Sequence, residues 1–325
     1  MSRMADGQGP IFLTATDYDL PDPVPEGIAK YTGFQEMARG GSALLRTCFD
    51  QLTGRTVVMK TLLPEFQHDP KEHRRLLREA RVTAQLQHPN TVPVYEIGND
   101  PAEGLYFTMK RVSGENLFEV LKRIARGNAE TVAEFPLRRR LDIVAGAAQA
   151  LMYAHARGVI HRDVKPENIW VGNFGEVILL DWGVAKVWGQ PDNAPQHPLL
   201  LQCEPETIQA LTMAGDRPGT PLYMSPEQVN VNRAMIDERT DVFSTGVVLY
   251  EMAAFREPFR GRVIQETFEN IIHDTPPPPS AASPGRGIPP ALDEVVMKAI
   301  SKKPADRFQT MRQMLEAIRM IEFAD

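Results

Sequence analysis

The sequence predicts an α+β chain in which a small β-rich part precedes a larger, mainly helical part. The run Val57–Lys60 is apolar and β-branched up to its closing lysine, which is typical of a buried strand. The range 71–86 is amphipathic and predicts a helix. The apolar range 141–154 is interrupted by Asp142 and Gln149 and is too short to span a bilayer, so we expect a buried helix there.

Composition narrows the class of protein. The chain has 325 residues and a formal net charge of −6, which argues against a nucleic-acid partner. Its two cysteines, Cys48 and Cys203, are widely separated and give neither a disulfide framework nor metal-ligand spacing. We therefore expect a cytoplasmic protein without a membrane segment.

The most informative feature is the range 161–168, which reads His-Arg-Asp-Val-Lys-Pro-Glu-Asn and is followed by Asp-Trp-Gly at 181–183. Phosphoryl transfer needs positioned reactants and neutralised charge. Within this pattern, Asp163 can orient the attacking hydroxyl and Lys165 can place a cation against the γ-phosphate. Asn168 and Asp181 offer the hard oxygen ligands that magnesium prefers.

These motifs resemble those of the eukaryotic-like serine/threonine protein kinases of bacteria. The resemblance implies a bilobal protein kinase fold, with a small β-rich N-lobe that carries helix αC and a larger, mainly helical C-lobe. It also implies transfer of the γ-phosphate of ATP to Ser or Thr hydroxyls of proteins, the chain itself included, with Mg²⁺ or, as a substitute, Mn²⁺. Self-association for trans-autophosphorylation belongs to the same expectation. A nucleotide-binding pseudokinase scaffold and a kinase of small molecules stay open as alternatives.

The nucleotide half of the resemblance begins with Lys60 and Glu79. A buried lysine without a partner is costly, so a carboxylate should reach Lys60 from another element. Glu79 lies within the predicted helix, at the family's distance before the Leu-x-His-Pro-Asn of residues 86–90. Taken alone, Glu79 would be a solvated helix carboxylate. Together with Lys60 it is expected to form an ion pair.

The glycine-rich loop is the weakest match. With Leu45 at the family's valine position, the three glycine positions fall on Ala38, Gly40 and Ala43, and Gly41 follows the middle one. Alanine in a left-handed conformation costs roughly 1 to 2 kcal/mol. If Ala38 and Ala43 limit the approach of the backbone to phosphate, restoring glycine at both is expected to tighten ATP binding by on the order of 1 kcal/mol. With ordinary β angles at both alanines, the loop would still cover the nucleotide.

The resemblance also assigns the adenine side of the site. The range 105–112 looks like the strand that enters the hinge, with Met109 at the gatekeeper position. Backbone groups of Lys110 and Val112 would then meet the adenine edge. Val58, in the strand that ends at Lys60, belongs to the same nucleotide-binding set.

Further downstream, the range 219–227 resembles the substrate-docking segment, with Ser225 in place of the usual alanine. Asp241 opens an apolar helix and is expected to anchor the backbone of residues 161–168, the expected catalytic loop. Arg307 is expected to pair with Glu227. These roles are structural.

The domain organisation follows from the same pattern. Residues 1–28 predict a flexible tail, and residues 29–322 a kinase domain. Its N-lobe covers about 29–109, its hinge about 110–114 and its C-lobe about 115–322. A polar, proline-dotted stretch at about 190–205 is interpreted as an insertion in the activation segment. The chain is then either a soluble kinase or an excised catalytic domain.

A regulatory hypothesis concerns phosphorylation of Thr212. The resemblance implies that Arg162, Lys186 and Arg75 form a cation cluster that a phosphate on Thr212 would bind. Thr220 is expected to act unmodified, with its hydroxyl near the catalytic residues. The alternative is an exposed Thr212 with no role.

Overall fold

The structure is a computed structural model that describes residues 23–187, 221–230 and 236–321 of the chain. The chain divides into two compact units. One comprises Met1–Gln87 and Val92–Ser113, and the other comprises His88–Thr91 and Gly114–Asp325. The predicted insertion at 190–205, Thr212, Thr220 and most of the expected tail lie outside the described residues.

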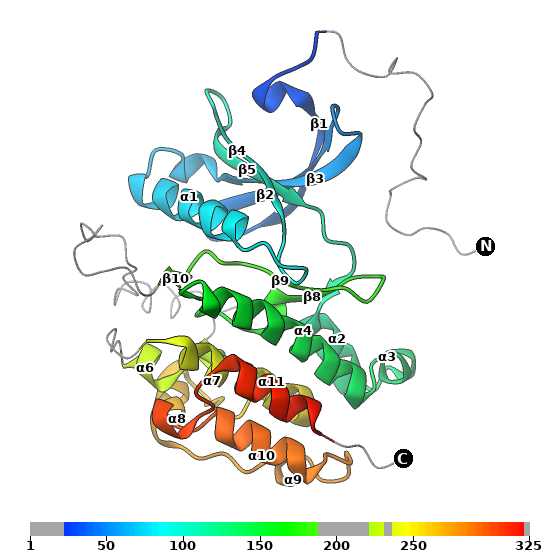
Figure 1. Ribbon diagram of the computed structural model, residues 1–325, viewed down its shortest axis with the longest axis vertical. Helices are drawn as coiled ribbons and strands as arrows, with labels where there is room; N and C mark the ends of the chain where they lie inside the picture. The colour runs from blue at the N-terminus through cyan, green and yellow to red at the C-terminus, as the bar shows by residue number, and fades with distance from the viewer. Residues whose placement is uncertain (1–22, 188–220, 231–235, 322–325) are drawn as a thin grey trace. The chain divides into compact units, whose positions relative to one another are not determined.

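The first unit contains a five-stranded antiparallel sheet and one long helix (Figure 1). The strand order is β1-β2-β3-β5-β4. The strands are β1 (Tyr31–Arg39), β2 (Ala43–Asp50), β3 (Arg55–Leu62), β4 (Val94–Asp100) and β5 (Gly104–Lys110). Short 3-10 helices precede β1 and follow β3: η2 (Gly27–Lys30) and η3 (Pro64–Phe66). Residues 27 and 28, which the sequence assigned to the tail, thus belong to η2.

The long helix of this unit is α1 (Pro70–Gln85), within one residue of the predicted range. The Asp69 side chain caps its N-terminus by accepting a hydrogen bond from the Lys71 N–H at 2.7 Å, and Pro70 suits the first turn. One apolar cluster joins α1 to the sheet: Leu62, Leu76, Ala80 and Phe107. This packing fixes which face of α1 meets the strands.

The second unit is mainly helical and holds two small sheets, with orders β6-β8-β9 and β10-β7. Its strands are β6 (Glu115–Asn116), β7 (Val159–Ile160), β8 (Ile169–Val171), β9 (Val177–Leu179) and β10 (Lys186–Val187). Its helices are α2 (Leu117–Ala125), α3 (Ala129–Glu134), α4 (Leu137–Ala156), α6 (Pro226–Val229), α7 (Glu238–Ala254), α8 (Ile264–His273), α9 (Pro279–Ala282), α10 (Pro290–Ala299) and α11 (Met311–Arg319). Short 3-10 helices are η4 (Pro166–Asn168), η5 (Pro221–Tyr223) and η7 (Pro304–Asp306).

Helix α7 is the core of the second unit, because every residue from Thr240 to Ala254 is buried. It packs against α4, α10 and α11. Gly246 allows the close approach to α10, since a Cβ atom there would lie 2.6 Å from the Ala299 Cβ. The predicted buried helix at 141–154 lies within α4. A β-rich part followed by a helical part confirms the α+β class.

One buried carboxyl in this core, that of Glu251, has a raised pKa. Glu251, on α7, is 7% exposed and accepts a hydrogen bond from the Tyr223 hydroxyl at 2.6 Å. Burial raises the pKa of Glu251 to about 7, and the nearby Glu257 and Glu167 act in the same direction. The Tyr223 hydrogen bond opposes this shift only in part. Ionised Glu251 is therefore unfavourable in the folded chain.

Replacing Glu251 with glutamine is expected to stabilise the fold above neutral pH. The folded chain keeps the proton up to about pH 7, whereas the unfolded carboxyl loses it near its ordinary value of 4.5. The free energy of unfolding should therefore fall between these two pH values, by up to about 3 kcal/mol, and stay lower at higher pH. Urea unfolding at pH 5 and pH 8 measures this fall, which Glu251→Gln should remove.

The matched control is Glu316→Gln, at an exposed glutamate of α11, which should leave the pH dependence as it is in the parent. Equal stability of the parent and Glu251→Gln at pH 8 would contradict the expectation.

Candidate active site

Lys60 and Glu79 meet within the first unit. Lys60 lies in β3, between Leu45 of β2 and Phe107 of β5. Its Nζ is 2.5 Å from Oε1 of Glu79 on α1, and the two side chains are only 14% and 13% exposed. Attraction is stronger at such a shielded position than at the open surface. The ion pair expected from the sequence is present.

The connection between β1 and β2 consists of residues 40–42. Ala38 pairs with Leu45, and Ala43 pairs with Leu62, so both alanines lie in the sheet. Neither alanine has a positive φ angle. The premise of strained, left-handed alanines is therefore wrong, because β pairing gives both residues ordinary strand angles. Glycine at these positions would therefore relieve no backbone strain.

A second contact ties this connection to α1. The Ser42 hydroxyl donates to Oε2 of Glu72 at 2.6 Å, and Glu72 also forms an ion pair with Arg75 at 3.0 Å. Arg75, expected in a regulatory cation cluster, thus has a carboxylate partner one helical turn away. The sequence offered no signal for the Ser42–Glu72 contact, because the two residues are not related by any local spacing.

The residues assigned to the adenine side lie at the end of β5 and just after it. Met109 pairs with Val58 of β3 and with Val94 of β4. The Lys110 N–H donates to the Pro93 carbonyl at 3.0 Å, so this N–H already has a partner within the first unit. Val112 lies beyond the strand, in a segment without regular secondary structure.

The catalytic loop of the second unit is held by the fully buried carboxylate of Asp241. This carboxylate accepts hydrogen bonds from the backbone N–H groups of His161 and Arg162, both at 2.8 Å, and contacts His155 Nε2 at 2.7 Å. Burial alone would raise the pKa of Asp241, but His155, His161 and the Arg162 N–H together lower it. The predicted anchoring of the loop backbone by Asp241 is confirmed.

Asp163, Lys165 and Asn168 form one contact group. Lys165 Nζ lies 2.6 Å from Asp163 Oδ2. Asn168 Nδ2 donates to the Asp163 carbonyl at 2.8 Å and to its Oδ2 at 3.1 Å. Burial works against the charge on Lys165, but Asp163, with help from Asp181 and Glu167, raises the pKa of Lys165 above its ordinary value. Lys165 is therefore a permanent cation beside the Asp163 carboxylate.

Asp181 follows the hairpin of β8 and β9. The residue before it, Leu180, donates its N–H to the Asn168 carbonyl at 2.8 Å and accepts from His161 Nε2 at 3.0 Å. Asp181 itself has φ 63° and accepts from the Gly183 N–H at 3.2 Å. Two hydrogen bonds thus connect this segment to the catalytic loop.

The residues at this point fit a magnesium ion. Asn168 uses Nδ2 to hold Asp163, so Oδ1 is the atom that it would offer to a metal. Asp181 adds a carboxylate, and the residue before it, Leu180, is hydrogen-bonded to the Asn168 carbonyl. Two protein oxygen donors suit magnesium in kinases, because phosphate oxygens and water complete its octahedral shell.

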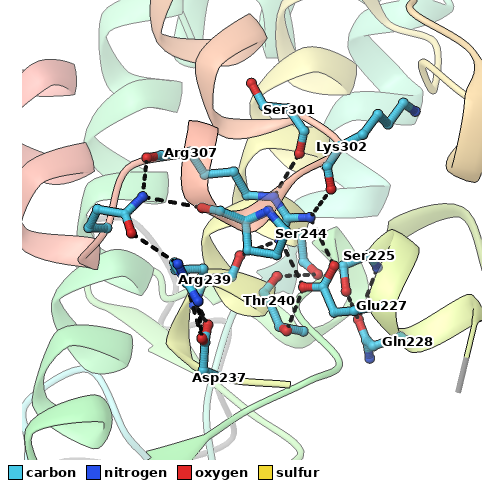
Figure 2. Close-up of polar contacts among 12 residues, drawn as sticks. Ser225, Glu227, Gln228, Asp237, Arg239, Thr240, Ser244, Ser301, Lys302 and Arg307 are labelled. Carbon is cyan, nitrogen blue, oxygen red and sulfur yellow. Dashed lines mark hydrogen bonds and ion pairs between the residues drawn. The ribbon is translucent and has the colours of Figure 1, made fainter. Parts of the chain in front are cut away.

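The described part of the range 219–227 is anchored at Glu227 by a buried ion pair, shown in Figure 2. Arg307 donates to both carboxylate oxygens of Glu227, at 2.8 and 2.9 Å, and the Thr240 hydroxyl donates to Glu227 at 2.8 Å. Burial alone would raise the pKa of Glu227, but Arg307 and Thr240 hold it below its ordinary value. The predicted pairing of Arg307 with Glu227 is confirmed.

Two of the three expected regulatory cations lie close to each other. Arg162 Nε donates to the Val184 carbonyl at 2.7 Å, and Lys186 Nζ donates to the Ile236 carbonyl at 3.1 Å. Burial lowers the pKa of Lys186, and Arg162 lowers it further. The two charges therefore repel each other, although each side chain also has a backbone partner.

Sequence reasoning missed one further residue beside the catalytic loop, Gln228. Its Nε2 donates to the Arg162 carbonyl at 2.9 Å. Ser225 and Gln228 stand three positions apart, and this Ser-x-x-Gln spacing is the signature of a capping box at a helix start. That signal predicts the short helix α6, but not the contact with Arg162.

The match to known proteins agrees with this geometry. The family model described as "Protein kinase domain" matches residues 31–318. The chain therefore belongs to the protein kinase family, as a domain of the bacterial serine/threonine type that resembles eukaryotic kinases. Among the described residues, no helix is both long enough and apolar enough to cross a membrane.

Several curated relatives are named serine/threonine-protein kinase PknD. The protein from Protochlamydia amoebophila is 32% identical over 295 residues, which cover 89% of this chain and 29% of the relative. The protein from Chlamydia trachomatis is 32% identical over 308 residues, covering 89% and 31%. The protein from Chlamydia pneumoniae is 31% identical over 296 residues, also covering 89% and 31%. The chain thus spans about three tenths of the length of these relatives.

Proposed function

We propose that this chain transfers the γ-phosphate of ATP to serine and threonine hydroxyls of proteins, its own included. The observation that carries the proposal is the contact group around Asp163, whose carboxylate meets Lys165 Nζ and Asn168 Nδ2. An acid that is held beside a cation and in contact with a metal-ligand candidate, Asn168, suits phosphoryl transfer. Membership of the protein kinase family supports the same reaction.

In the proposed reaction, Asp163 orients the substrate hydroxyl and takes its proton while the new oxygen–phosphorus bond forms and the bond to the departing ADP breaks. Lys165 stabilises the charge on the transferred group. Lys60, held by Glu79, binds phosphates of the nucleotide. Asn168 and Asp181 would hold the magnesium, which would supply charge neutralisation at the phosphate oxygens. The remaining proposed nucleotide contacts are Ala38, Gly40, Gly41, Ala43, Leu45, Val58, Met109, Lys110 and Val112.

We further propose that residues 29–322 form the kinase domain, with a hinge at about 110–114. A cytoplasmic location fits the need for ATP and the free thiol of Cys48. Protein substrates, and a second copy of the chain for trans-autophosphorylation, are the proposed partners.

The proposal is tested by transfer of labelled phosphate from ATP to the chain and to a generic basic protein. Asp163→Asn keeps the shape of the side chain but removes the proton-accepting carboxylate. It should lower kcat by about two to four orders of magnitude and leave ATP binding intact. Activity equal to the parent's would remove Asp163 from this role. A parent that binds ATP but labels neither protein would favour the pseudokinase alternative.

Asp181→Ala should abolish the contribution of magnesium to nucleotide binding, because Asn168 alone is a neutral ligand. Calorimetry with ATP, with and without magnesium, measures this contribution directly. The variant should bind ATP equally in both conditions, whereas the parent should bind more tightly with magnesium. A magnesium effect of unchanged size in the variant would contradict the metal assignment.

Phosphorylation of Thr212 is proposed to switch the enzyme on. Arg162 and Lys186 repel each other, and a phosphate of about −1.5 to −2 charges would bind both. Thr212→Ala should therefore lower the rate of transfer, while Thr207→Ala, at a second threonine of the same segment, should not. Mass spectrometry of the autophosphorylated chain should find phosphate in residues 211–217. An unmodified Thr212 in the fully active enzyme would exclude the switch.

A further inference from the structure

The side-chain amide of Gln228 is fixed at both of its ends. Oε1 accepts hydrogen bonds from the N–H of Ser225 at 3.0 Å and from its hydroxyl at 3.2 Å, as Figure 2 shows. Nε2 donates to the carbonyl of Arg162 at 2.9 Å. Gln228 is 9% exposed and Ser225 is fully buried. An amide whose oxygen and nitrogen both have partners cannot turn without losing hydrogen bonds.

The carbonyl that Gln228 holds belongs to the peptide group that leads into Asp163. The N–H of the same peptide group is that of Asp163, and it donates to His161 Nδ1 at 3.2 Å. Gln228 therefore holds one side of this peptide plane, and His161 holds the other. A rotation of the plane would move the Asp163 Cα, and the carboxylate with it.

This peptide group needs such support because Arg162 has φ 67°. A residue with a side chain in this left-handed region is strained by about 1 kcal/mol or more, and it stays there only when its surroundings over-determine it. Asp241 holds Arg162 on its N-terminal side, through the N–H at 2.8 Å. Gln228 holds Arg162 on its C-terminal side, by donating a hydrogen bond to its carbonyl.

We infer that Gln228 is a positioning residue for Asp163, which links the segment 225–229 to the peptide group that carries the proposed catalytic acid. This inference rests on the proposed function of Asp163. Helix α6 would then support Asp163 in addition to its expected part in substrate docking. When the segment 225–229 is in place, the peptide before Asp163 is held on both sides, and when it is displaced, one side is released.

Two substitutions of Gln228 separate positioning from helix capping. Gln228→Glu keeps an oxygen for Ser225, because glutamate also serves in capping boxes, but it cannot donate to the Arg162 carbonyl. Gln228→Met has a similar size and loses both contacts. If Gln228 positions Asp163, both variants should lose about tenfold or more in kcat with an unchanged KM for ATP, because small misplacements of reacting groups cost up to about 100-fold.

Thermal unfolding of the same variants reports on stability, and both should unfold at a lower temperature. Gln228→Met loses both sets of hydrogen bonds, and Gln228→Glu sets a buried carboxylate oxygen against the Arg162 carbonyl, so kcat is the readout that separates the two roles. The matched control is Gln313→Glu, the same change at an exposed third position of α11, which should alter neither kcat nor Tm. A residue that only caps α6 would leave Gln228→Glu as active as the parent, and this outcome would overturn the inference while the proposed function stands. A parent chain that transfers no phosphate would overturn both.

Discussion

The catalytic half of the site depends on one buried charge, the carboxylate of Asp241. An ionised carboxylate in a protein core is strongly unfavourable unless hydrogen bonds and opposite charge offset its desolvation. Here the two backbone N–H groups of the catalytic loop and His155 provide that compensation. The loop is thus held because the core would otherwise contain an unsatisfied charge. From His161 the contacts continue to Leu180, and from Leu180 to Asn168, so both proposed metal ligands derive their placement from this point.

Helix α7 supports α6 as well as the catalytic loop, through adjacent residues. Asp241 holds the loop, and Thr240 donates to Glu227 in α6. Gln228, next to Glu227, reaches back to the Arg162 carbonyl, so the contacts form a closed circuit. If one of these residues were displaced, the hydrogen bonds of the others would oppose the displacement, because a close-packed interior transmits strain. The buried ion pair of Glu227 and Arg307 is a further contact that fixes α6.

The sequence predicted those contacts that follow from short motif spacing. Lys165 and Asn168 reach Asp163 because they lie two and five residues away in one loop, and Asp181 follows at the end of a single hairpin. Lys60 and Glu79 could be paired because a buried cation needs an anion. The contact of Gln228 with a backbone carbonyl and that of Ser42 with Glu72 depend on the path of the main chain. The pattern of residue types does not determine that path. For the same reason, the sequence could not show that Ala38 and Ala43 adopt strand angles.

Among the described residues, three without glycine's freedom have positive φ angles: Arg162, Asp181 and Phe255. Arg162 directly precedes the proposed catalytic residue Asp163, and Asp181 is itself a proposed metal ligand. Strain of this kind persists only where other interactions exceed it, and it concentrates at functional sites. At Arg162 the opposing hydrogen bonds come from α7 and α6, and at Asp181 the adjacent Leu180 is held by Asn168 and His161. Because these supports belong to different elements, the active geometry is a property of the assembled second unit, and a displacement of α6 is enough to release one side of the Asp163 peptide.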